Sequence, residues 1–143
     1  MNREEQALFL TLYYLDDTSL ARACQVNKRF YQRVCNALWL RRLQQYDGII
    51  QTFPGEVQNQ SVKDQYLLLR NLDRLKVLLP PLNNLTLLKI SQLDRLDLSR
   101  LGLTELPREI GQLVNLVGLY VYDNRLTELP QEIRSLPNVR IYE

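Results

Sequence analysis

Apolar residues follow two different patterns in the two halves of the chain. In the first half they recur at the three- and four-residue spacing of amphipathic helices. Leu8, Leu12 and Leu15 form one such stripe, and Asp16 and Asp17 then interrupt it and are suited to cap a second helix. Helical spacing resumes after a turn at residues 26–27, and a further segment opens at residue 36 and ends at residue 43. The pattern predicts a unit of short helices over residues 1–47.

The middle of the chain reads as a loop followed by one longer helix. Residues 48–60 are polar and contain Gly48 and Pro54-Gly55, which predicts a linker. Ser61 and Asp64 have capping-box-like spacing, and a helix is expected over residues 62–79, before a Pro-Pro step. Its apolar stripe is expected to be core and to cover the exposed end of the segment that follows; it consists of Tyr66, Leu69, Leu72, Leu75 and Leu79.

The second half is built from a repeat of 23 residues. Residues 93–98 (LDRLDL) align with residues 116–121 (LVGLYV), and the LTELP segment at 103–107 recurs at 126–130. A third start is visible at residues 139–142 (VRIY). Apolar positions alternate with exposed ones at the start of each repeat, which predicts short strands. Pro107 and Pro130 predict a stop followed by a helical or 3-10 return.

This pattern closely resembles the leucine-rich repeat, in the 23-residue form with a Leu-Pro step that is typical of intracellular members. The resemblance implies a short solenoid of parallel strands over residues 93–143, and an α+β protein overall. Residues 61–92 are then the connecting helix and an irregular cap, in which a degenerate strand through Leu85, Leu88 and Ile90 is one alternative. Asn124 stands where the family uses a buried Asn to hold the turn. Because Leu101 replaces it in the first repeat, that turn is expected to lack these hydrogen bonds.

The outward positions of the predicted strands form the expected concave face of the repeats. Tyrosine beside arginine and aspartate is a composition typical of binding hot spots. An ordinary solvated surface is the alternative, since two repeats offer a small face compared with a standard interface of about 800 Å² per partner. The predicted target-binding residues are Arg95, Asp97, Arg100, Tyr120, Tyr122 and Asp123.

The first 47 residues resemble the F-box. The family has a leucine-bearing helix, an Asp-Leu step, Val-Cys-Lys-x-Trp and Leu-Trp-x-x-Leu; this chain has LTLYYL at 10–15, TSL at 18–20, VNKRF at 26–30 and LWLRRL at 38–43. The segment SVKDQY at 61–66 is similar to the Ser-Trp-Lys-x-x-Tyr helix that often follows the box. The family's opening Leu-Pro-x-Glu is absent, Ser19 replaces the usual Asp, and Phe30 replaces the usual Trp.

The F-box resemblance implies a bridge between two proteins. The box would dock on the Skp-type adaptor of a cullin–RING (SCF-type) ubiquitin ligase, while the repeats hold a target. An alternative is a leucine-rich-repeat binding module with no ligase link, whose helices serve only as a cap. The divergent form is similar to F-box-like proteins of large amoebal viruses and intracellular bacteria, which suggests an effector acting in a host cell. The predicted adaptor-binding residues are Leu8, Phe9, Leu12, Leu15, Leu20, Val26, Lys28 and Phe30.

The composition limits the kinds of catalytic and metal-binding site that the chain can form. The 143 residues contain no histidine and two cysteines, which excludes histidine-dependent nucleophiles and the common zinc sites. We therefore expect a non-enzymatic protein with no cofactor and no metal. Cys24 and Cys35 are expected to be buried, reduced thiols. The charged N-terminal segment and the short apolar runs predict a cytoplasmic protein that does not enter the membrane.

The charge is nearly balanced, with 18 basic and 16 acidic residues, so a dedicated nucleic-acid binder is not expected. The segment from Arg22 to Arg42 nevertheless carries six basic residues and no acidic one. Attraction to an acidic adaptor and a plain solvated helix face are the favoured interpretations, and contact with a nucleic acid is the third.

Overall fold

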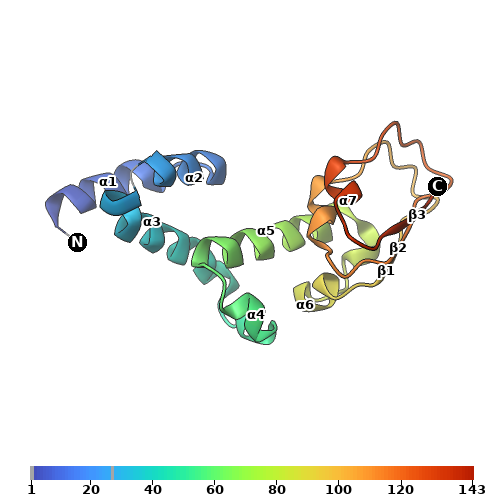
Figure 1. Cartoon of the computed structure of the whole chain (residues 1–143), viewed down its shortest axis with the longest axis horizontal. Coiled ribbons are helices and arrows are strands. Elements are labelled where there is room, and N and C mark those ends of the chain that lie inside the picture. Colours follow the sequence, from blue (N-terminus) through green and yellow to red (C-terminus); the bar gives the residue numbers. More distant parts are fainter. Residues whose placement is uncertain (1, 27) are drawn as a thin grey trace. The chain divides into compact units, whose positions relative to one another are not determined.

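The computed structural model describes residues 2–26 and 28–143, and describes no side chains at residues 28–31. It combines helices with one small parallel sheet, as expected for an α+β protein (Figure 1). The chain forms two compact units, Met1–Tyr66 and Leu67–Glu143. The boundary lies inside a helix, and residues 48–66, which we expected to be a linker and the start of a cap, are grouped with the N-terminal helices.

Helices α1 (Arg3–Tyr13), α2 (Asp17–Val26) and α3 (Lys28–Leu43) form the frame of the first unit. Helix α1 begins five residues before the predicted stripe, because Asn2 and Glu5 form a capping box: each side chain accepts a hydrogen bond from the backbone N–H of the other. Asp16 caps α2 as predicted, accepting from the backbone N–H groups of Thr18 and Ser19. Helix α3 packs against both α1 and α2.

Two local predictions for this unit are wrong. Helix α3 continues without interruption through residue 36, because Val34, Cys35, Leu38 and Trp39 lie on one buried stripe. The predicted loop at 48–60 contains helical turns, η2 (Ile50–Thr52) and α4 (Gly55–Gln58), which follow η1 (Gln44–Tyr46). The buried amide of Gln65 stabilises the end of this segment by donating to the carbonyls of residues 58 and 60.

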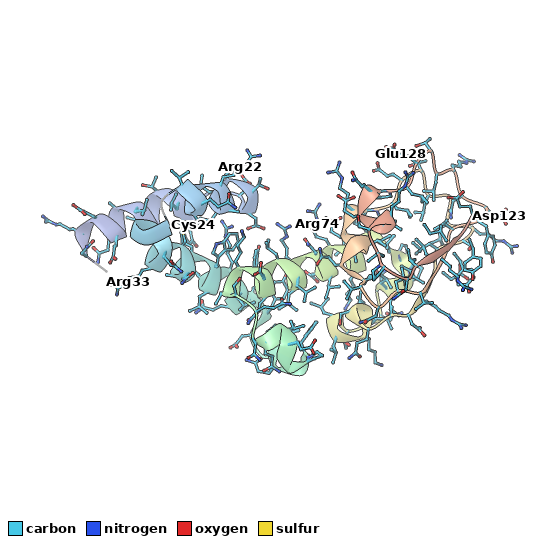
Figure 2. The ribbon with its side chains drawn as sticks, viewed as in Figure 1. Arg22, Cys24, Arg33, Arg74, Asp123 and Glu128 are labelled. Carbon is cyan, nitrogen blue, oxygen red and sulfur yellow. A yellow bond between two sulfur atoms is a disulfide. The ribbon has the colours of Figure 1, made fainter. Side chains whose placement is uncertain are left out.

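Several arginines of the basic segment have partners inside the first unit. Arg42 pairs with Asp17 and also donates to the carbonyl of Leu15. Arg33 lies 3.8 Å from Glu5, and the Arg41 guanidinium lies over a tyrosine ring of α1 at 5.0 Å. These contacts reduce the charge that the segment offers to a partner. Arg22 remains exposed on α2 (Figure 2).

The prediction of reduced cysteines is wrong for this structure, which joins Cys24 of α2 to Cys35 of α3 in a disulfide (Figure 2). The two Cα atoms are 6.0 Å apart. The pairing follows from the packing of α2 against α3, which brings two positions 11 residues apart in sequence onto facing sides of the helices.

The second unit begins with the C-terminal part of α5 (Val62–Leu78), followed by η3 (Pro80–Leu82) and α6 (Leu87–Ser91). The predicted stripe is confirmed, because all five of its members are buried. The degenerate strand at residues 85–90 is not formed. Thr86 caps a short helix there, accepting from the backbone N–H of Lys89, and Leu87 and Ile90 turn into the core.

A three-stranded parallel sheet follows, in the order β1 (Arg95–Asp97), β2 (Gly118–Tyr120) and β3 (Arg140–Tyr142) (Figure 1). The returns are a 3-10 helix, η4 (Arg108–Gln112), and a short α-helix, α7 (Gln131–Arg134), each starting after a Leu-Pro step as predicted. Apolar residues from strands and returns fill the space between them; they include Leu96, Leu98, Ile110, Leu113, Leu116, Leu119, Val121 and Ile133.

The last strand departs from the 23-residue period. Gly118 is the partner of both Arg95 and Arg140, so the second interval is 22 residues. Ile141, not Tyr142, therefore lies opposite Leu119. A shift of one residue moves every side chain of a strand to the other face, so Arg140 and Tyr142 lie on the same face as Gly118 and Tyr120.

The two returns touch at Gly111, which predicts a sensitive position. A Cβ at residue 111 would lie 2.7 Å from the Cβ of Glu132 and 3.2 Å from its carbonyl oxygen. Gly111→Ala should therefore push α7 away from η4 and lower the free energy of unfolding by about 1–3 kcal/mol, measured by urea denaturation. Gly55→Ala is the control, because a Cβ there meets nothing within 4 Å. Equal stability of both variants would contradict the close packing of the returns.

Candidate protein-binding face of the repeats

The outward face of the sheet carries polar and aromatic side chains from all three strands. Arg95, Gly118 and Arg140 form one row across the sheet, and Asp97, Tyr120 and Tyr142 form the next. The rings of Tyr120 and Tyr142 stack with centroids 4.6 Å apart and planes 8° apart. Three of the predicted target-binding residues, Arg95, Asp97 and Tyr120, thus share one face.

The other three predicted target-binding residues form a separate cluster in the turns after the strands. Arg100 and Asp123 occupy equivalent positions with positive φ, 60° and 56°. The Arg100 Nε donates to Asp123 at 3.1 Å, and its guanidinium lies 5.8 Å from the ring centre of Tyr122. These side chains already satisfy one another, so they offer a partner less unpaired charge than the strand residues do.

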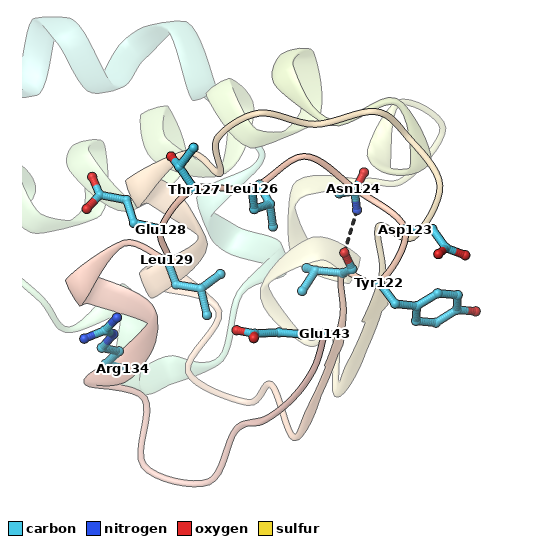
Figure 3. A pocket seen from close by; sticks show the side chains of 10 residues that line it. Tyr122, Asp123, Asn124, Leu126, Thr127, Glu128, Leu129, Arg134 and Glu143 are labelled. Atoms are coloured by element: carbon cyan, nitrogen blue, oxygen red, sulfur yellow. Dashed lines mark hydrogen bonds between the residues drawn. The ribbon is translucent and has the colours of Figure 1, made fainter.

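Asn124 holds these turns together. Its side-chain oxygen accepts from the backbone N–H groups of Leu101 and Leu103, at 3.1 and 3.0 Å. Its amide nitrogen donates to the carbonyls of Leu98 and Val121, both at 2.8 Å, and Figure 3 draws the second of these bonds. The expectation that the first turn lacks such bonds is wrong, because Asn124 of the second repeat reaches back to that turn.

Asp97 is restrained by its own turn. The backbone N–H of Ser99 donates to its carboxylate at 2.9 Å, and this hydrogen bond holds the pKa of Asp97 below its usual value. The carboxylate therefore stays ionised at neutral pH. It contributes a fixed negative charge to the second row of the face.

A hollow of about 410 Å³ opens over the first row, at the N-terminal ends of the strands. Three of the residues around it were not among the predicted target-binding residues: Asn138, Arg140 and Tyr142. The 23-residue alignment of the last strand explains why, since it directs Tyr142 inward. The signal that could have found them is Ile141, the one aliphatic residue between two polar side chains.

A second hollow, of about 310 Å³, lies at the end of the last repeat (Figure 3). Leu126 and Leu129 are half-buried there, and Glu128, Arg134 and Glu143 lie around them. Its mixed lining brings together no set of groups with an evident chemical role.

The predicted adaptor-binding residues of the helical unit occupy different environments. Leu12 and Leu20 are buried in its core, whereas Leu8, Phe9 and Leu15 are half-buried. The side chain of Val26, another of these residues, is 84% exposed. Asn27, in the turn predicted at residues 26–27, and the side chains of Lys28 and Phe30 lie outside the described residues.

Within residues 2–26 and 28–143, no helix has the length and apolarity needed to cross a membrane. Within that same part of the chain, histidine, cysteine, aspartate and glutamate side chains form no cluster of three or more suited to hold a metal ion.

Comparison with known proteins identifies one part of the chain. No family model matches it, and no solved structure matches it. The leucine-rich repeat protein soc-2 homolog of Drosophila grimshawi is 44% identical over 48 residues, and those of Drosophila virilis and Drosophila simulans are 44% and 39% identical over 47 and 49 residues. These matches span 33–34% of this chain but only 7–8% of the relatives' length. Over about a third of its length, the chain is therefore similar to leucine-rich repeat proteins, and this similarity supports a leucine-rich-repeat element.

Proposed function

We propose that this protein is a non-enzymatic interaction adaptor with two binding surfaces. The repeats hold a target on the outward face of the sheet, and the helical unit docks on a Skp-type adaptor of a cullin–RING ubiquitin ligase. The observation that carries the first half is the row of polar and tyrosine side chains across three parallel strands. Glu105 and Glu128 recur with the repeat, which is typical of structural positions, and we assign them no reaction.

Solvent-facing apolar side chains support the second half of the proposal. Leu10 of α1, Val26 of α2 and Leu40 of α3 are all exposed, and so is Tyr14 at the end of α1. A contiguous exposed apolar patch marks an interaction surface, and these four side chains lie on, or at the end of, three helices of one unit. The buried positions Leu12 and Leu20 would then shape the helices, while these exposed residues would make the contact.

Val26→Asp tests the adaptor contact. The full chain is co-expressed with a Skp-type adaptor, and the complex is measured by size exclusion and calorimetry. A one-to-one complex is expected, and Val26→Asp should weaken it at least about tenfold, because an ionised carboxylate in an apolar contact is costly to desolvate.

Val77→Asp is the matched control, since Val77 is 77% exposed on α5 within the second unit. It makes the same chemical change and should leave the affinity unaltered. No measurable binding by the unmodified protein would refute the ligase link, and the chain would then be a repeat module whose partner binds elsewhere. If Val26→Asp and Val77→Asp weakened adaptor binding equally, the loss of affinity would come from the added negative charge and not from a contact at Val26.

A further inference from the structure

The first row of the sheet face contains two unpaired cations on either side of a glycine. Arg95 and Arg140 are both exposed, and both are register partners of Gly118. The two outer strands are separated by two strand spacings, or about 10 Å, which lets two arginine side chains converge on one group. Two other arginines of the unit are used internally: Arg74 pairs with Glu109 at 3.2 Å, and Arg100 pairs with Asp123.

The lining of the hollow above this row supplies several hydrogen-bond donors, alongside Val117 and Gly118. Besides Arg95 and Arg140, it presents the amide of Asn138 and the phenol groups of Tyr120 and Tyr142, and it includes no carboxylate. Among the described residues, neither guanidinium has a hydrogen bond or an ion pair with another side chain. The nearest acidic position on the strands, Asp97, is held by the N–H of Ser99.

The stacked tyrosines and the glycine give the hollow a fixed shape. A Cβ at residue 118 would lie 3.4 Å from the ring of Tyr120 and 3.6 Å from the side chain of Arg95. These are ordinary van der Waals distances, so the Tyr120 ring lies directly over residue 118, and it also stacks on Tyr142. Rings that are already packed against each other lose little conformational entropy when a ligand binds.

We propose that this hollow binds an anionic side chain of an extended protein segment, with the carboxylate or phosphate group between Arg95 and Arg140. Guanidinium groups bind both kinds of oxyanion through charge-assisted hydrogen bonds. The segment would cross the strands and pass over the tyrosine pair. This inference rests on the proposed function to the extent that the repeat face holds a protein.

A protein segment fits this face better than a nucleic acid does. The hollow has two cations, and the next row of the same face carries the carboxylate of Asp97, so a chain of phosphates that continued along the strands would meet repulsion after its first contact. The tyrosines are stacked on each other, which leaves no gap between them for a base. A protein segment with one anionic side chain flanked by uncharged residues matches the two arginines of the hollow.

The test uses three short extended peptides that are identical except at one central residue: glutamate, phosphoserine or glutamine. Each is titrated into the isotope-labelled full chain, and the Nε–H signals of Arg95 and Arg140 are followed by NMR. The glutamate or the phosphoserine peptide should bind at least about fivefold more tightly than the glutamine peptide, and should shift both arginine signals. The tighter of the two identifies the anion as a carboxylate or a phosphate.

Arg95→Gln and Arg140→Gln should each weaken the preferred peptide at least about fivefold. Arg108→Gln is the matched control, because Arg108 is an exposed arginine on η4, and it should have no effect. The proposal would be overturned if the three peptides bound with equal affinity or if none of them bound. It would also be overturned if Arg95→Gln and Arg140→Gln both bound the preferred peptide as tightly as the unmodified protein does. Tighter binding of a short single-stranded oligonucleotide with the same arginine shifts would also overturn it. The adaptor proposal is tested separately, by the affinity of Val26→Asp for a Skp-type adaptor. A failure of the peptide test can therefore be distinguished from a failure of the adaptor test.

Discussion

Replacing Asn124 with alanine should lower the free energy of unfolding of the second unit by about 3 kcal/mol. The side chain makes four hydrogen bonds to backbone groups of two successive turns. Each such bond contributes a net stability of about 0.5–1.5 kcal/mol, and alanine removes all four partners at once. The loss should be read by urea denaturation, with amide NMR signals of the strands as the probe. The fluorescence of Trp39, which is buried in the first unit, should keep its unmodified midpoint.

Asn115→Ala is the matched control for this experiment. Asn115 is exposed and its amide makes one hydrogen bond, to the carbonyl of Ser91 at 3.1 Å. Its replacement should cost less than about 1 kcal/mol. If both variants lost the same stability, the turns would be held by the strands and not by Asn124, and the coupling of the two repeats through this residue would be refuted.

The role of Asn124 also illustrates what a repeat alignment predicts and what it does not. The 23-residue period correctly predicts the first two strands, the Leu-Pro steps and the buried positions of the two full repeats, because each depends on residues within one repeat. Leu101 in the first repeat suggested a turn without hydrogen bonds. The hydrogen bonds to that turn come from Asn124 of the neighbouring repeat. The prediction failed because it considered only the residues of the first repeat.

The last strand was mispredicted for a related reason. Identity over most of the repeat suggested an offset of 23, but the observed register pairs Gly118 with Arg140 and places the half-buried Ile141 opposite Leu119. Removing one residue between two strands shortens a loop only slightly, but it turns every side chain of the following strand to the opposite face of the sheet. This register places Arg140 and Tyr142 on the candidate binding face.

In the helical unit, local sequence patterns predicted the helices well, but they did not predict the contacts between helices. The stripes and the Asp16 cap are visible in short stretches of sequence. The disulfide between Cys24 and Cys35 depends on how α2 packs against α3, and composition alone favoured free thiols. Burial of Leu12 and Leu20 depends on the same packing, so a list of apolar positions could not separate the core from the solvent-facing residues.

Leu72→Ala should produce a second large loss, of about 3–4 kcal/mol in the free energy of unfolding of the second unit. Leu72 lies on α5 with an exposed fraction of 0%. Removing its branched end creates a cavity next to a core that already relies on few repeats, and fully buried leucines of this kind cost about 2.7–5 kcal/mol when truncated. The strands should lose their protection from hydrogen exchange together with the helix, because a repeat cannot bury its apolar face alone.

Leu78→Ala separates burial from helix propensity. Leu78 ends the same helix but is 50% exposed, and alanine is at least as good a helix former as leucine, so this variant should lie within about 1 kcal/mol of the unmodified protein. A large loss at Leu72 with little change at Leu78 means that α5 completes the core of the repeats. Similar small losses at both positions would mean that the repeats are stable without it, and the short element would then need no helical cap to present its binding face.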